Sequence, residues 1–265
     1  MPTAKVRDVE LFHTIDGAGD TTVLLIHGLG CDSDDWAWQL DPLSERYRVV
    51  APDLRGHGRS TASVSGYAPP ELAADIAALV EELATGPVVA VGHSMGGVVA
   101  SALAVEHPEL VSAVVTVDPA YGIEPADMAG LDAVSAGLDS AAGRDALLAL
   151  IAGVEGTETP PFQRELHRRN VQRTPLRVLR GSFAGLWAEP ARFGQADVAG
   201  AYLRRRRCPV LAVYADPVRA AWDESTFTTS GSRAVSWPGV GHWLHQERPA
   251  EFNALLLDWL AATPG

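Results

Sequence analysis

The chain has 265 residues, of which 47% are hydrophobic and 20% charged, a composition that allows a soluble globular protein to bury a large core. Its formal net charge of −12 argues against a nucleic-acid partner, which would need a basic face. No apolar run approaches the roughly 20 residues of a membrane span. The first ten residues lack a signal-peptide pattern, so we expect a cytoplasmic protein with no membrane partner.

Short apolar runs alternate with helical patterns along the chain. The first stretch, Val6–Ile15, alternates weakly and is predicted to form an antiparallel edge of a sheet. Later runs are apolar without alternation, which is typical of strands buried on both faces; they are Val23–Ile26, Val88–Val91, Ala113–Val117 and Pro209–Tyr214. Helical spacing of apolar residues recurs at Pro70–Leu83, Ser94–Glu106 and Phe252–Trp259. This order predicts an α/β fold with a mostly parallel, doubly wound sheet.

One long segment interrupts this alternation. Between about residues 119 and 207 no buried strand is evident, and helix-like stretches occur at Ala133–Leu138, Arg144–Ile151 and Gln163–Gln172. We interpret the segment as a helical cap, or lid, inserted between two core strands. The predicted organisation is therefore a core of residues 1–118 and 208–265 with a cap of residues 119–207.

The motif with the clearest chemistry is Gly92-His93-Ser94-Met95-Gly96. It matches G-x-S-x-G and lies between a predicted strand and a predicted helix, which is the context that a nucleophilic serine needs. Ser94 would project at a helix N-terminus, where free N–H groups favour developing negative charge. We therefore predict Ser94 as the nucleophile of an acyl-transfer reaction.

A second motif, His27-Gly28-Leu29-Gly30, follows the strand Val23–Ile26. Acyl transfer requires two donors that hold the tetrahedral oxyanion. The backbone N–H of Met95, next to the nucleophile, is one candidate. The N–H of Leu29 in this glycine-rich loop is the natural second donor of the oxyanion hole.

A serine hydroxyl needs a neighbouring base, and His242 in Gly239-Val240-Gly241-His242 is the predicted one. It follows the last predicted strand, Arg233–Ser236, and the expected chain order is serine, acid, histidine. Two aspartates at strand ends could orient its imidazole. Asp216 is the preferred acid, and Asp118 is the alternative, since both stand at the carboxyl end of a strand and precede a proline.

The motifs together resemble the α/β-hydrolase superfamily in its short, cap-bearing branch. The resemblance covers roughly residues 5–118 and 208–262 and rests on HGLG (27–30), PDLRGHGRS (52–60), GHSMGG (92–97) and GVGHWLHQERP (239–249). It implies a catalytic triad of Ser94, Asp216 and His242, with Leu29 and Met95 as the oxyanion hole. The segment Tyr214–Pro217 lacks a glycine that the family often carries before its acid, which keeps Asp118 open.

These observations predict a serine hydrolase that cleaves a small-to-medium, largely apolar carboxylic ester or lactone through an acyl-enzyme. The alternatives are a carbon–carbon bond hydrolase on a β-diketone-like substrate, a cofactor-free haloperoxidase or perhydrolase, and a ligand receptor on the same fold. Three tryptophans are expected to bind substrate, namely Trp36, Trp187 and Trp243. The expected partner is a small-molecule substrate, with no cofactor and no metal. The pattern leaves the natural substrate and the oligomeric state open.

Overall fold

The computed structural model describes residues 2–157, 159–188 and 192–263. Within these residues eight strands form one sheet in the order β1-β2-β4-β3-β5-β6-β7-β8. β1 and β2 pair antiparallel, as do β2 and β4, and the remaining neighbours are parallel. The α/β fold with a mostly parallel sheet is thus confirmed. The strands are β1 (Thr3–Val6), β2 (Val9–Asp16), β3 (Thr22–Ile26), β4 (Arg48–Pro52), β5 (Val88–His93), β6 (Val111–Val117), β7 (Val210–Tyr214) and β8 (Arg233–Ser236).

The central strands β3, β5, β6 and β7 are largely apolar because both faces of the sheet are covered there. Side chains of a strand alternate between faces; in β3, Leu24 and Ile26 join one core cluster while Val23 and Leu25 join the other. The first cluster is completed by helices α2 (Pro69–Glu82), α3 (Met95–Glu106), α8 (Ala196–Leu203) and α9 (Pro217–Glu224). The second is completed by α1 (Ala37–Ser44) and α11 (Pro249–Ala262).

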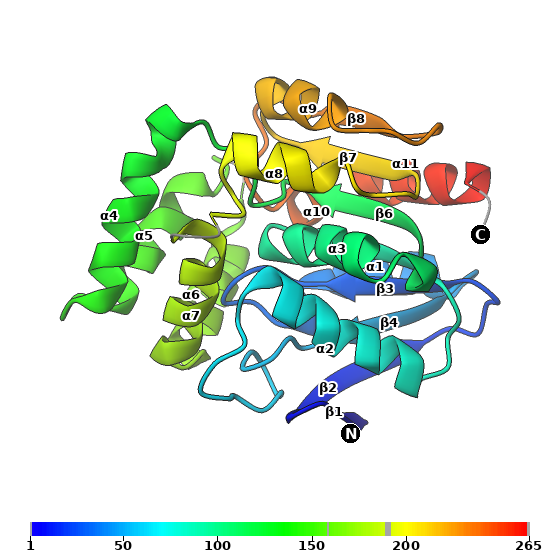
Figure 1. The fold of residues 1–265 in the computed structure, drawn as a ribbon, viewed down its shortest axis with the longest axis horizontal. Helices are drawn as coiled ribbons and strands as arrows, with labels where there is room; N and C mark the ends of the chain where they lie inside the picture. The colour runs from blue at the N-terminus through cyan, green and yellow to red at the C-terminus, as the bar shows by residue number, and fades with distance from the viewer. Residues whose placement is uncertain (1, 158, 189–191, 264–265) are drawn as a thin grey trace.

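Four helices stand together beside the sheet, at the left of Figure 1. They are α4 (Met128–Asp139), α5 (Arg144–Val154), α6 (Pro161–Arg173) and α7 (Leu176–Trp187), and they occupy part of the segment between β6 and β7 for which a cap was expected. The next helix of the same segment, α8, instead packs against α3 through buried residues such as Ala199 and Leu203. Below, the name cap refers to α4–α7 and their connections.

Several elements were not anticipated from the sequence. The segment that leads into the PDLRGHGRS motif, and ends at its first residue Pro52, forms β4, and α7 extends the helical content of the cap. The expected single edge strand is a hairpin of β1 and β2. Short helical elements complete the described chain: η1 (Ser33–Trp36), η2 (Pro108–Leu110), η3 (Pro125–Asp127) and α10 (Leu244–Glu247). No helix in the described ranges is long and apolar enough to cross a membrane.

Candidate active site

Ser94 occupies a sharp turn between β5 and α3. Its φ of +51° and ψ of −118° lie in a region that costs a non-glycine residue of order 1–3 kcal/mol. The turn is held by hydrogen bonds from Ser94 N–H to Val117 O (2.9 Å) and from Ala120 N–H to Ser94 O (3.1 Å). Only glycine fits beside it, because a Cβ on Gly96 would lie 2.1 Å from Ile26 O. The backbone therefore fixes where the Ser94 side chain emerges.

The loop that follows β3 approaches Ser94 closely. A Cβ on Gly28 would lie 3.3 Å from the Ser94 Cβ, so the glycine permits this approach. His27 braces the loop: its Nε2 accepts from Leu54 N–H (2.9 Å), which leaves a proton on Nδ1 to donate to Gly28 O (2.8 Å). The N–H groups of Leu29 and Met95 have no acceptor within the described part of the chain. They are available for a ligand at this position.

His242 lies in the loop between β8 and α10, and its Nδ1 is 2.5 Å from Asp118 Oδ2. The other carboxylate oxygen of Asp118 accepts from Arg219 (3.1 Å). Burial raises the pKa of Asp118, but the charge of Arg219 and the hydrogen bond with His242 outweigh it, so the pKa lies below its usual value. An ionised Asp118 keeps a proton on His242 Nδ1 and leaves Nε2 as an acceptor.

The structure places Asp118, and not Asp216, against His242. Asp216 is exposed and caps α9, where its Oδ1 accepts from Val218 N–H (2.8 Å). An aspartate before a proline at the first helical position is a common helix start, and here it has that local role. The expected contact of Asp216 with His242 is therefore wrong, and Asp118, the alternative, makes it.

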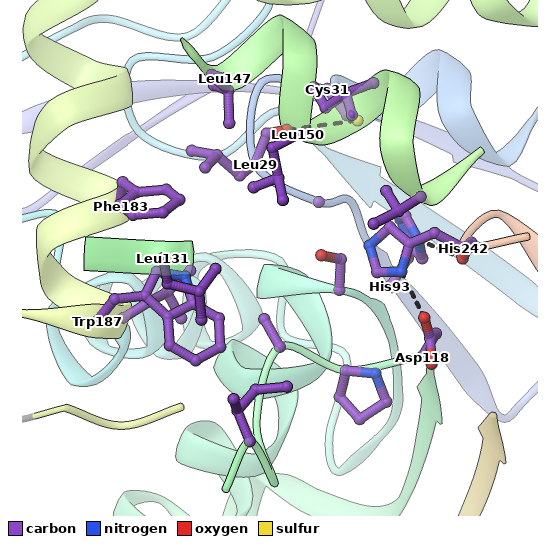
Figure 2. A pocket seen from close by; sticks show the side chains of 18 of the residues that line it. Leu29, Cys31, His93, Asp118, Leu131, Leu147, Leu150, Phe183, Trp187 and His242 are labelled. Atoms are coloured by element: carbon purple, nitrogen blue, oxygen red, sulfur yellow. Dashed lines mark hydrogen bonds and ion pairs between the residues drawn. The ribbon is translucent and has the colours of Figure 1, made fainter. Parts of the chain in front are cut away.

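Ser94, His242 and Asp118 line one cavity of about 190 Å³ between the sheet and the cap. Figure 2 shows cap side chains across the cavity from His242 and Asp118. The cap contributes apolar side chains to the wall, including Leu131, Leu147, Leu150, Phe183, Leu186 and Trp187. No hydrogen bond joins Ser94 Oγ to His242 among the residues described; such bonds are often long without substrate and tighten when it binds.

The three tryptophans expected to bind substrate differ in position. Trp187 and Trp243 line the cavity. Trp36 does not; it is fully buried in the second core cluster, with its ring 4.5 Å from that of His245. The prediction that Trp36 contacts substrate was wrong because η1, which follows β3, directs this side chain into the second core cluster.

A cluster of three buried polar side chains, those of Asp35, His93 and His245, lies next to the His242 loop. His93 Nε2 donates to the His242 carbonyl (3.0 Å), and its Nδ1 is 3.9 Å from Asp35 Oδ2. With His245, these residues offer ligand atoms within 4.8 Å of one another. Two ligands bound to one zinc ion at about 2.0–2.1 Å lie only about 3.4 Å apart. The 3.9 Å between His93 Nδ1 and Asp35 Oδ2 is longer than that spacing.

Two fully buried histidines, His57 and His245, predict acid-sensitive folding. Burial lowers the pKa of each from 6.5 to about 3. Below about pH 6.5 the unfolded chain takes up these protons and the folded chain does not, so stability falls as the pH drops from 6.5 toward 3. Each histidine contributes at most roughly 1.4 kcal/mol per pH unit. Unfolding free energies between pH 7.5 and 4.5 should show this decline, and His57→Gln should flatten its slope. An unchanged slope in that variant would contradict the assignment.

Comparison with known proteins places this chain in a family. The profile of the alpha/beta hydrolase family matches residues 23–255, which covers most of the chain, including strands β4 to β8 and the cavity residues. The chain belongs to the alpha/beta hydrolase family.

Individual relatives within this family are diverse. Over 234 residues (86% of this chain and 83% of the relative) the chain is 31% identical to 2-(acetamidomethylene)succinate hydrolase of Mesorhizobium japonicum. It is 42% identical over 116 residues to the dihydrolipoyllysine-residue acetyltransferase component of the acetoin cleaving system of Cupriavidus necator, a match that spans only 31% of that protein. The structure resembles a thermophilic esterase from Thermogutta terrifontis with a TM-score of 0.84, 25% identity and 99% coverage of both chains.

Proposed function

We propose that this hydrolase is a serine hydrolase that cleaves an uncharged, largely apolar carboxylic ester or lactone. The observation that carries the proposal is the pairing of Asp118 with His242 in the same cavity as the strained turn of Ser94. A serine at such a turn, with an oriented imidazole on one side and free N–H groups on the other, has the parts that acyl transfer requires.

The proposed reaction has two steps. His242 Nε2 takes the Ser94 proton while Ser94 Oγ attacks the carbonyl carbon, and the Leu29 and Met95 N–H groups hold the oxyanion. The tetrahedral intermediate expels the alkoxide, which takes the proton from His242, and an acyl-Ser94 remains. Water then loses a proton to His242 as it attacks the acyl carbon, and His242 returns that proton to Ser94 Oγ when the second tetrahedral intermediate releases the acid. Asp118 stabilises the imidazolium in both steps.

The charges around the cavity favour an uncharged substrate. Among the described lining residues, Arg219 is the single guanidinium, and it donates to Asp118, to Pro119 O and to Tyr121 O. It is therefore committed to the protein. A carboxylate buried against the leucines and aromatic rings of the cap would lack a counterion, which costs several kcal/mol. An aliphatic chain gains about 0.8 kcal/mol per buried methylene.

Two esters that differ only at one end of the acyl chain test this substrate class. Ethyl hexanoate ends in a methyl group and monoethyl adipate in a carboxylate. We expect kcat/KM to be at least about tenfold higher for ethyl hexanoate, equivalent to about 1.4 kcal/mol, measured by quantifying ethanol release. Leu131→Lys, which adds a cation to the cavity wall, should narrow the difference. A preference of the unaltered protein for monoethyl adipate would refute the proposed class.

A further inference from the structure

Glu247, at the end of α10, joins the loop of His242 to the cap. Its Oε2 accepts from Gly241 N–H (2.8 Å), the residue immediately before His242. Its Oε1 accepts from Gly156 N–H (3.2 Å) and from Thr159 Oγ1 (2.6 Å), both in the connection between α5 and α6. A single carboxylate thus binds the core loop with one oxygen and the cap with the other.

The two segments also meet directly. A Cβ on Gly241 would lie 2.1 Å from Gly156 N, so their backbones touch with no side chain between them. The His242 N–H donates to Val154 O at the end of α5 (2.9 Å), and the His242 carbonyl accepts from His93. The backbone of the proposed base is therefore held by the cap on one side and by the sheet on the other.

An aromatic contact adds to this interface between the His242 loop and the cap. The ring of His167, on α6, stacks on Trp243 at 3.8 Å with an interplanar angle of 17°. His167 also bonds Glu155 (2.9 Å) and Gln246 (3.2 Å). Trp243 and Gln246, which lie between Gly241 and Glu247 in the chain, thus contact α6 of the cap. The Glu247 carboxylate belongs to this larger set of contacts between the His242 loop, α10 and the cap.

Glu247 has no ion-pair partner among the residues that the structure describes. Its charge is balanced by two backbone N–H groups and a hydroxyl, and hydrogen bonds to an ionised acceptor are about twice as strong as neutral ones. One of the two N–H groups belongs to Gly241, the residue immediately before His242, so the carboxylate acts directly on the loop of the proposed base. A shift of about 1 Å in a base can cost roughly a hundredfold in rate.

We propose that Glu247 is a positioning residue that fixes the His242 loop (residues 239–243) against the α5–α6 connection and so aligns His242 Nε2 with Ser94. The proposal rests on the proposed function, because it requires His242 to be the base. The cap thereby helps to place the base in addition to forming the wall of the cavity.

The test compares Glu247→Ala, Glu247→Gln and the control Glu251→Ala. Glu251 is an exposed carboxylate on α11 that pairs with Arg248 (3.6 Å). We would measure the rate of Ser94 labelling by a fluorophosphonate, together with kcat and KM for ethyl hexanoate, well below the melting temperature of each variant. Glu247→Ala should lower labelling and kcat by about 10- to 100-fold with KM nearly unchanged. Glu247→Gln, which keeps the shape and one acceptor oxygen, should recover part of the loss, and Glu251→Ala should match the unaltered protein.

Wild-type labelling and kcat in Glu247→Ala, accompanied only by a lower melting temperature, would overturn the proposal and leave Glu247 a structural brace. If Glu247→Ala does not fold, Thr159→Val removes the hydroxyl donor alone and should give a smaller loss of kcat; unaltered rates in both Thr159→Val and Glu247→Gln would likewise overturn it. Failure of the proposed function is distinct, because the unaltered protein itself would then not be labelled at Ser94.

Discussion

Ser94→Ala should lower kcat/KM for ethyl hexanoate by roughly four to six orders of magnitude, the range expected when the nucleophile of a triad is removed. The loss follows because no acyl-enzyme can form without Oγ. The fold should persist, since the strained φ of +51° is held by the hydrogen bonds of the Ser94 backbone, which alanine retains. Steady-state kinetics and the melting temperature measure the two effects separately.

Covalent labelling distinguishes a lost nucleophile from a damaged site. A fluorophosphonate should add one label, which peptide mapping should place on Ser94. Labelling should vanish in Ser94→Ala and become very slow in His242→Ala, because an unactivated hydroxyl is a weak nucleophile. Ser112→Ala, which alters a β6 serine bonded to Val88 O, is the matched control and should label normally. Substantial hydrolysis by Ser94→Ala would exclude Ser94 as the nucleophile.

The sheet and the Ser94 turn were predictable because their signals are local. An unbroken apolar run such as Val88–Val91 is typical of a strand in a parallel sheet covered on both faces, and G-x-S-x-G after it specifies a turn that needs small residues on both sides. β4 was missed because its apolar run, Val49–Pro52, is short and merges with the loop motif that follows. The cap helices were visible only in part, since helical periodicity does not specify what a helix packs against.

Which of the two aspartates contacts His242 was a question of sheet order rather than of local pattern. Asp118 and Asp216 both end a strand and precede a proline. β6 is the direct neighbour of β5, which ends one residue before Ser94, whereas β7 lies one strand further away. The pairing order of strands is a tertiary property, and an Asp-Pro pair is also a helix start. An Asp-Pro pair followed by a helical pattern predicts a helix cap. This was the sequence signal that Asp216 caps a helix and does not contact His242.

The remaining site residues depend on contacts between distant segments. The local sequence does not distinguish Trp36 from Trp243 as a substrate contact. Trp36 is nevertheless buried in the second core cluster, whereas Trp243 lines the cavity. Arg219 and Glu247 were not singled out, because a charged residue on a short helix is ordinarily solvated. Their importance comes from partners about 100 residues away, Asp118 for Arg219 and Gly156 for Glu247, and no spacing rule connects such pairs.

Two isosteric substitutions, Asp118→Asn and Asp216→Asn, test which aspartate orients the His242 imidazole. Asp118→Asn should lower kcat/KM by roughly ten-thousand-fold, because an amide can donate to Nδ1 and so favours the tautomer whose Nε2 cannot accept the Ser94 proton. It also leaves Arg219 without its anionic partner beside a base that must become positive. Asp216→Asn should retain activity within about twofold and keep its stability, since asparagine caps a helix as well as aspartate does.

The two variants control for each other, because each removes one carboxylate at a strand end before a proline. Kinetics with ethyl hexanoate should be paired with the melting temperature, so that a loss through unfolding is recognised. A large loss in Asp216→Asn together with an active Asp118→Asn would mean that the His242 loop rearranges to reach β7 during turnover. Equal, small effects of both would mean that His242 works without a carboxylate. The 2.5 Å contact between His242 and Asp118 predicts neither result, because a buried hydrogen bond to an ionised oxygen strongly restricts the imidazole to one orientation.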